Sequence, residues 1–172
     1  MSTALVASEK KGIAEARILQ LVTFTLAEEE YAVDILKVQE INRMKEITRV
    51  PNAPHYVEGV INLRGKVIPV VSLRKKFGLP EEEDTAKKRI MIMDIQGVTI
   101  GLIVDSVNEV LRISSDIVEP PPAMTSSVSS EFIWGIAKLE DRLIILLDMD
   151  RFIGKEESMG MIGEAEKFAI ES

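Results

Sequence analysis

The 172-residue sequence contains no cysteine and only one histidine, His55. Without cysteine there can be no disulfide, no thiolate metal site and no cysteine nucleophile. A single histidine excludes a metal site built from several imidazoles and leaves one candidate for an imidazole base. The sequence therefore lacks most of the side chains that enzymes use for catalysis, and we expect neither a metal nor a cofactor.

Positive charge and aromatic residues are also scarce. The chain has 21 Lys and Arg against 28 Asp and Glu, a formal charge of −7, and 5% aromatic residues. Binding to nucleic acid through counterion release needs clustered Lys and Arg, and single-stranded binding adds aromatic residues between them. A nucleic-acid-binding barrel is therefore disfavoured. The hydrophobic content of 46% is typical of a folded globular protein.

Long hydrophobic runs are absent from the sequence. The longest purely apolar run, Leu143 to Leu147, is far shorter than the roughly 20 residues that a membrane span needs. The segment from Met1 to Lys11 has no basic start followed by an apolar stretch, so it does not resemble a signal peptide. We expect a cytoplasmic protein.

What the sequence does contain is an excess of β-branched residues, 21 Ile and 16 Val. Their side chains are stiff at χ1 and pack well on a pleated surface, so the sequence predicts an all-β fold with an aliphatic core. Residues 1–17 are polar and lack periodicity, which predicts a flexible N-terminal arm. In the tail, residues 154–172, Met161, Ala165 and Phe168 have the spacing of a helix.

An internal repeat divides the chain into two halves. Val38-Gln-Glu-Ile41 matches Val107-Asn-Glu-Val110 at an offset of 69, and the segment from Gly59 to Gly78 matches the segment from Gly135 to Gly154 at an offset of 76. The match predicts two barrels of about five strands each, over residues 18–80 and 88–153, that share an apolar interface. Because apolar β-sequences match one another easily, chance similarity is the alternative.

One hairpin of the first half contains a proline. Val57–Leu63 and Val67–Leu73 flank Arg64-Gly65, which predicts a two-residue turn. Pro69 lies inside the second run. Because proline cannot donate a backbone hydrogen bond, we expect an edge or bulged strand there.

Motifs that would indicate catalysis or metal binding are weak. Ser72-Leu-Arg-Lys75 fits S-x-x-K, but its partner motifs S-D-N and K-T-G are missing. A small hydrolase that uses Ser72 and Lys75 remains an alternative. Asp148-Met-Asp150 offers two carboxylates, but the other ligands and the glycine of an EF-hand loop are absent.

Two ionic residues stand out against apolar surroundings. Glu40 lies between Val38 and Ile41 in an apolar run, and Arg64 lies at the tip of the predicted hairpin. They are either two exposed residues on a strand and a turn, or an ion pair that marks one end of a binding surface.

Several blocks resemble the CheW family of bacterial chemotaxis coupling proteins. In the first half these are Phe24-Thr-Leu, Val38-Gln-Glu-Ile, Arg49-Val-Pro-Asn-Ala-Pro and Asn62-Leu-Arg-Gly-Lys-Val-Ile-Pro-Val; in the second half they are Gly101-Leu-Ile-Val-Asp, Glu119-Pro-Pro-Pro and Gly135-Ile-Ala-Lys. The resemblance runs from about residue 19 to residue 153. It implies two intertwined five-stranded SH3-like barrels and no enzymatic activity.

The resemblance also implies the partners. Members of the family connect the cytoplasmic tips of methyl-accepting chemotaxis receptors to the histidine kinase CheA, so the membrane is reached only through the receptors. A CheW-like adaptor for another two-component kinase pathway is the alternative, and nothing in the sequence separates the two.

The family's functional residues can be placed on this sequence. Val38, Glu40 and Arg64 occupy the matching positions of the receptor-facing groove between the barrels, where the acid pairs with the arginine. One contact with the regulatory domain of CheA is expected near Asn42–Val50. A second is expected at the loop that starts at Glu119, where Met124 takes a place that can be a bulkier aromatic residue in relatives.

Overall fold

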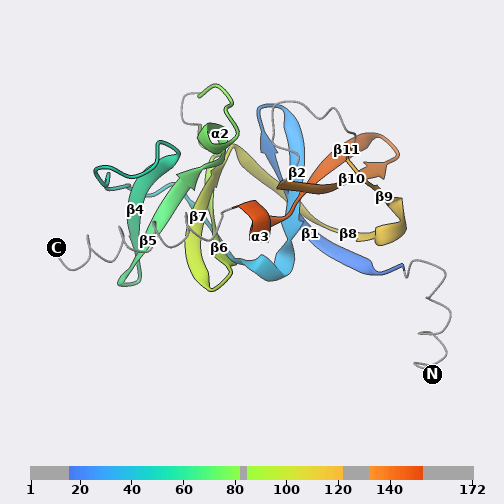
Figure 1. Cartoon of the computed structure of the whole chain (residues 1–172), viewed down its shortest axis with the longest axis horizontal. Helices are drawn as coiled ribbons and strands as arrows, with labels where there is room; N and C mark the ends of the chain where they lie inside the picture. Colours follow the sequence, from blue (N-terminus) through green and yellow to red (C-terminus); the bar gives the residue numbers. More distant parts are fainter. Residues whose placement is uncertain (1–15, 82–84, 122–131, 153–172) are drawn as a thin grey trace.

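Strands make up most of the described part of the chain in the computed structural model (Figure 1). The structure describes residues 16–81, 85–121 and 132–152. The strands are β1 (Ile18–Leu26), β2 (Glu29–Asp34), β3 (Val38–Arg43), β4 (Val57–Leu63), β5 (Lys66–Ser72), β6 (Arg89–Ile95), β7 (Val98–Val104), β8 (Ser106–Ser114), β9 (Val118–Glu119), β10 (Ile133–Leu139) and β11 (Arg142–Leu147). The helices are η1 (Ile35–Lys37), α2 (Leu73–Lys76), η2 (Ser115–Ile117) and α3 (Met149–Phe152).

The all-β prediction is confirmed, with short helices at the ends of strands. The predicted N-terminal arm, apart from residues 16 and 17, and the predicted tail helix lie outside the described residues.

The two halves of the sequence exchange hairpins. One sheet has the order β8-β1-β2-β11-β10-β9, and the other has the order β3-β6-β7-β5-β4. The hairpin β1-β2 of the first half therefore lies among strands of the second half, and the hairpin β6-β7 lies among strands of the first half. Each inserted hairpin makes one parallel pairing with its host, β2 with β11 and β7 with β5. The ranges 18–80 and 88–153 thus describe the sequence repeat, and neither range forms a sheet by itself.

The turns of the hairpins follow from local sequence. Arg64 and Gly65 have φ of 53° and 86°, and Gln96 and Gly97 have φ of 53° and 83°. Two successive residues with positive φ are typical of type I′ turns, which match the twist of the flanking strands. Glycine at the second position adopts this conformation without steric cost. The predicted hairpin at Arg64-Gly65 is therefore present.

Of the two expectations for the strand at Pro69, the edge strand is wrong, whereas the pairing of β5 with β4 does contain a register shift, between Val57 and Gly59. β5 lies inside its sheet, between β4 and β7. Pro69 is opposite Val60 of β4, whereas the pairing of β5 with β7 begins one residue later, at Val70. The strand tolerates the missing donor because the proline lies outside the stretch that is paired on both sides.

Three apolar clusters form the core. Two are aliphatic and belong to one sheet each, the first around Ile61, Ile68 and Ile90 and the second around Leu21, Ile144 and Leu146. The third and largest lies between the sheets and takes residues from both halves, including Phe24, Tyr31, Met91 and Leu102. Because this shared cluster joins the two barrels, neither barrel buries its apolar surface alone.

A buried ion pair joins one inserted hairpin to its host sheet. Asp105, which follows β7, accepts hydrogen bonds from Nε of Arg74 at 2.9 Å and from Nη2 at 2.6 Å. The same carboxylate accepts one from the backbone amide of Ala27 at 2.9 Å. Burial by itself would raise the pKa of Asp105, but these hydrogen bonds outweigh it and hold the pKa below the ordinary value. Asp105 therefore connects α2 to the exit of β7 and to the turn between β1 and β2.

Candidate functional site

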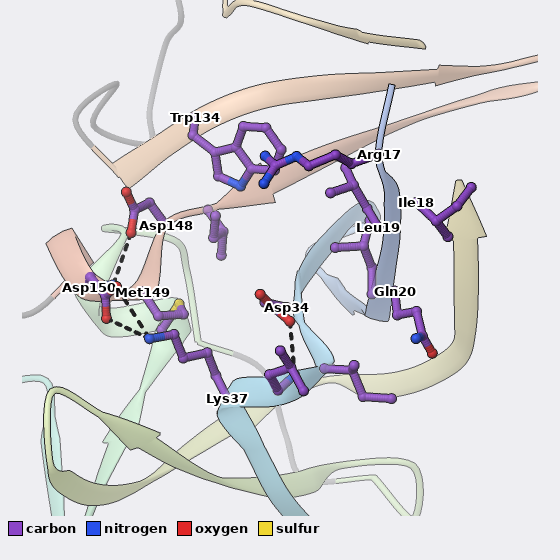
Figure 2. Close-up of a pocket in the computed structure, with 14 residues that line it drawn as sticks. Arg17, Ile18, Leu19, Gln20, Asp34, Lys37, Trp134, Asp148, Met149 and Asp150 are labelled. Atoms are coloured by element: carbon purple, nitrogen blue, oxygen red, sulfur yellow. Dashed lines mark hydrogen bonds and ion pairs between the residues drawn. The ribbon is translucent and has the colours of Figure 1, made fainter. Parts of the chain in front are cut away.

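A groove of about 570 Å³ is formed by strands of the six-stranded sheet together with η1 and the segment that leads into α3 (Figure 2). It is lined by the start of β1, by η1, by Trp134 of β10 and by the segment from Leu147 to Asp150 that leads into α3. We call it the seam groove. It takes residues from both halves of the sequence because the hairpin β1-β2 is inserted beside β11.

Three large apolar side chains of the seam groove are open to solvent. Ile18 is 59% exposed, Leu36 87% and Trp134 42%. Trp134 lies at a shift in the register between β10 and β11, and such bulges re-aim side chains. Exposed apolar residues gathered in one depression are typical of surfaces that bind a protein partner.

Polar groups fix the shape of the seam groove. The ammonium of Lys37 lies 3.0 and 3.3 Å from the two carboxylate oxygens of Asp150, and Asp34 accepts a hydrogen bond from the amide of Leu36 (Figure 2). The hydrogen bond to Asp150 raises the pKa of Lys37 above its ordinary value. Lys37 is therefore charged at neutral pH, and the ion pair holds η1 against α3.

The internal repeat provides a comparison for this groove. At the offset of 76, Trp134 corresponds to Glu58, and Glu58 pairs with Lys75 at 2.8 Å. Glu58 lines a smaller and more polar cleft of about 160 Å³ together with Ser72, Arg74 and Lys88. The seam groove is the larger and more apolar of the two, and for this reason it is the stronger candidate for a binding site.

The predicted ion pair between Glu40 and Arg64 is present. Nη1 of Arg64 donates to Oε1 of Glu40 at 3.3 Å, and Nη2 donates to Oε2. The hydrogen bond from Arg64 lowers the pKa of Glu40 below its ordinary value. The pair joins β3 to the turn between β4 and β5, the two ends of one sheet. Neither residue lines the seam groove, whereas Val38 packs against the shared core beside Lys37.

A second ion pair involves the equivalent acid of the other barrel. Nη2 of Arg142 lies 2.6 Å from Oε2 of Glu109, and its Nε lies 3.3 Å from Oε1 of Glu30. Glu109 matches Glu40 in the repeat, whereas Arg142, which begins the last strand of its hairpin, matches Lys66 and not Arg64. Both barrels therefore pair this acid with an arginine of a hairpin, although not with the equivalent arginine, which also fits a purely structural role.

The residues predicted for the kinase contacts lie on two separate parts of the molecule. Val50 lines a cleft of about 390 Å³ with Arg49, Pro51 and His55, beside the sheet that ends in β4. Glu119 is on β9, opposite Ile136 at the edge of the other sheet. Figure 1 shows β4 and β9 at opposite ends of the molecule. Met124 lies outside the described residues.

Ser72 and Lys75 have structural roles that disfavour a hydrolase. The hydroxyl of Ser72 accepts a hydrogen bond from the amide of Lys75 at 3.2 Å and caps α2. The hydrogen bond to Glu58 raises the pKa of Lys75 above its ordinary value, whereas a general base at neutral pH needs a lowered one. The ammonium of Lys75 is bound to Glu58 and is not positioned to activate a nucleophile.

Replacement of Ser72 by alanine is expected to lower the free energy of unfolding by about 1 kcal/mol, the usual cost of removing an N-cap. Chemical denaturation of wild type and Ser72→Ala measures this difference, and binding to partners should not change. A serine-reactive activity probe that labels wild type and not Ser72→Ala would contradict the structural role.

Metal binding finds no support in the described ranges, where no group of three or more His, Asp or Glu side chains could hold an ion. The carboxylate of Asp148 accepts a hydrogen bond from the amide of Asp150, and Asp150 pairs with Lys37. His55 contacts the ring of Tyr56 edge-on. Within the same ranges, no helix is long and apolar enough to cross a bilayer.

The fold and the groove define a scaffold of two joined β-barrels, and comparison with known proteins gives its family. Residues 20–157 match the CheW-like domain. The chain is 35% identical over 141 residues to the chemotaxis protein CheW of Klebsiella aerogenes, covering 80% of this chain and 83% of the relative. It is 37% identical over 139 residues to CheW of Helicobacter pylori, covering 81% and 84%.

A solved structure agrees with these relatives. The scaffolding protein TtCheW of Thermoanaerobacter tengcongensis has 40% sequence identity and a TM-score of 0.76, over 82% of this chain and 96% of that one. The chain belongs to the CheW family. Membership supports the role of a scaffold or adaptor in chemotaxis rather than that of an enzyme.

The prediction from sequence identified the family and the pair of Glu40 and Arg64, but it missed the residues that open the seam groove. Trp134 carried one signal, as the only tryptophan of the chain and the residue directly before Gly135. Leu36 and Ile18 carried none, because each lies in an ordinary apolar run.

Proposed function

We propose that the chain is a non-enzymatic adaptor that couples the cytoplasmic tips of methyl-accepting chemotaxis receptors to the histidine kinase CheA. The seam groove is the observation that carries the proposal. It presents Ile18, Leu36 and Trp134 to solvent in one depression of a chain that belongs to the CheW family. Receptor tips are helical hairpins, and an amphipathic helix binds to a protein by laying its apolar face into such a groove.

The charged pair of Glu40 and Arg64 is proposed to set the register of the receptor. Charges at the rim of an interface contribute more to orientation and specificity than to affinity. Val38 connects the two regions, because it follows Lys37 of the groove and precedes Glu40 on β3.

The kinase is proposed to bind at two other surfaces. One includes Val50 and the neighbouring cleft, and the other includes Glu119 and Met124. Because Val50 lines a different cleft from the seam groove, one adaptor can hold receptor and kinase together. Several weak contacts of this kind produce an ordered array through multivalency. The receptor can shift the equilibrium between two states of the kinase only through the adaptor. The size of that shift cannot exceed the difference in the adaptor's affinity for the two states.

Co-sedimentation tests the coupling directly. Fragments of receptor tips, CheA and the full chain are mixed, and the pellet is scored for all three proteins and for kinase activity. We expect CheA to enter the pellet and to be activated only when the chain is present. Recovery of a different two-component kinase from the same cells, with no recovery of CheA, would favour the alternative pathway instead.

A further inference from the structure

Charge is distributed unevenly along the chain. Residues 38–77 contain eight Lys and Arg against three Asp and Glu, a formal charge of +5, although the whole chain carries −7. The other 132 residues therefore carry −12. The cationic stretch forms β3, β4, β5 and α2, and its three strands belong to the five-stranded sheet. Figure 1 shows β4 and β5 at the opposite end of the molecule from β9. The fold thus gathers positive charge in one barrel of an acidic protein.

Part of this positive charge is used inside the fold. Arg64, Arg74 and Lys75 each pair with a carboxylate, and the ammonium of Lys76 lies 4.1 Å from the centre of the Tyr56 ring. Within the described ranges, the exposed cations of the stretch that make no ion pair are Arg43, Lys45, Arg49 and Lys66. These side chains are available to a partner.

Three of the available cations lie within seven residues of one another. Arg43 is the last residue of β3, Lys45 follows two residues later, and Arg49 lines the cleft that also contains Val50. We call Arg43, Lys45 and Arg49 the cationic edge. Glu46 is the only acid among the seven residues, so the edge keeps a net positive charge.

A fourth cation faces the cationic edge from the neighbouring strand. Arg89 of β6 lies directly opposite Arg43 of β3. Like charges in directly opposite positions of an antiparallel pair are destabilising. Nη1 of Arg89 donates to the carbonyl oxygens of Ala86 and Lys88, each at 2.8 Å, and neutral acceptors leave the charge in place. A carboxylate from outside the chain would accept hydrogen bonds from Arg43 and relieve the repulsion.

We propose that the cationic edge binds an acidic patch on the regulatory domain of CheA. The inference rests on the proposed function, in which Val50 belongs to a kinase contact, and it names the chemistry of that contact. A guanidinium donates two parallel hydrogen bonds to a carboxylate, so arginines are suited to this task. Complementary charges at the rim of an interface speed the encounter and fix the orientation of the partners.

The charge on the rest of the chain favours a local acidic patch over an extended anion. A nucleic acid or an anionic membrane would also face the other 132 residues, whose formal charge of −12 repels it. A protein surface with a few carboxylates can meet the cationic edge alone. The acidic part of the chain would then turn the same partner away from the other barrel.

Association kinetics with full-length CheA test the proposal. The triple variant Arg43→Glu/Lys45→Glu/Arg49→Glu should associate at least about tenfold more slowly than wild type at an ionic strength of about 0.01 M. The difference should narrow at about 0.15 M, because the Debye length falls from about 30 Å to about 8 Å. Each single variant should show part of the loss. The three residues are exposed, and circular dichroism of every variant checks that the fold is kept.

Arg112→Glu is the matched control. Arg112 is exposed like Arg49 and lies on β8 of the six-stranded sheet, so the variant has the same change in net charge at a different place. It should associate with CheA nearly as fast as wild type does. An equal loss of rate in Arg112→Glu and Arg49→Glu would overturn the proposal, since net charge alone would then explain the effect.

Three further outcomes would overturn the proposal. The first is an unchanged rate of association in the triple variant and in the single variants. The second is a triple variant that loses binding to receptor-tip fragments and keeps its rate with CheA, because the cationic edge would then serve the receptor. The third is binding of wild type to vesicles of anionic lipid that the triple variant loses while its rate with CheA is unchanged. Failure of the unmodified chain to bind CheA would instead contradict the proposed function.

Discussion

Replacement of Arg74 by alanine is expected to lower the free energy of unfolding by about 3–5 kcal/mol, the cost of removing one partner of a buried ion pair. The side chains of Arg74 and Asp105 are only 7% and 21% exposed. In the variant, the half-buried Asp105 carboxylate would lose its cation. Because a domain is stable by only about 5–15 kcal/mol, this is a large fraction of the total. Chemical denaturation of the two proteins measures the difference.

A more exposed ion pair supplies the control for this variant. Lys37 and Asp150 join the other inserted hairpin to α3, but their side chains are 33% and 46% exposed. Solvent screens an exposed pair, so Lys37→Ala should cost no more than about 1 kcal/mol. Equal losses of unfolding free energy in Arg74→Ala and Lys37→Ala would contradict the expectation that the less exposed ion pair contributes more to stability.

The same buried pair makes stability depend on pH. The pKa of Asp105 is lower in the folded chain than its ordinary value. Its contribution is therefore complete above the unfolded pKa of about 3.9 and is lost as the pH falls through the folded pKa. The difference in unfolding free energy between wild type and Asp105→Asn should accordingly shrink as the solution is acidified.

Reversal of the charge at Arg64 is expected to reduce binding to receptor tips at least about tenfold, because Glu40 would then face a second carboxylate at the proposed receptor surface. The fold should survive, since Arg64 is exposed and surface ion pairs contribute little to stability. A pull-down with receptor-tip fragments compares wild type with Arg64→Glu, and the double variant Glu40→Arg/Arg64→Glu should recover part of the binding.

Lys66→Glu is the control for this experiment. Lys66 lies on the same hairpin, two residues after Arg64, and is also exposed, so the variant has the same change in net charge. It should bind receptor fragments nearly as wild type does. Unchanged binding by Arg64→Glu would refute the role of the ion pair in receptor binding. An equal loss of binding in Lys66→Glu would show that the change in net charge, and not the ion pair, causes the effect.

Sequence determined the local features of this protein. The Ile and Val content predicted strands, and Arg64-Gly65 predicted a hairpin, because turn geometry depends on a few adjacent residues. The pairing of Glu40 with Arg64 was expected from the family resemblance together with their placement in an apolar run and at a hairpin tip. The repeat was visible because equivalent residues recur at nearly constant offsets.

Tertiary structure alone decided which strands are neighbours, and with them the groove. The period of a strand indicates which residues share a face, but it does not say which other strand lies beside it. The family resemblance implied intertwined barrels, but it was the structure that identified β1-β2 and β6-β7 as the exchanged hairpins. That exchange brings Ile18 and Leu36 to Trp134, about 100 positions further along the chain, and Asp105 to Arg74. The candidate binding site and the ion pair of Arg74 with Asp105 both arise from these non-local pairings.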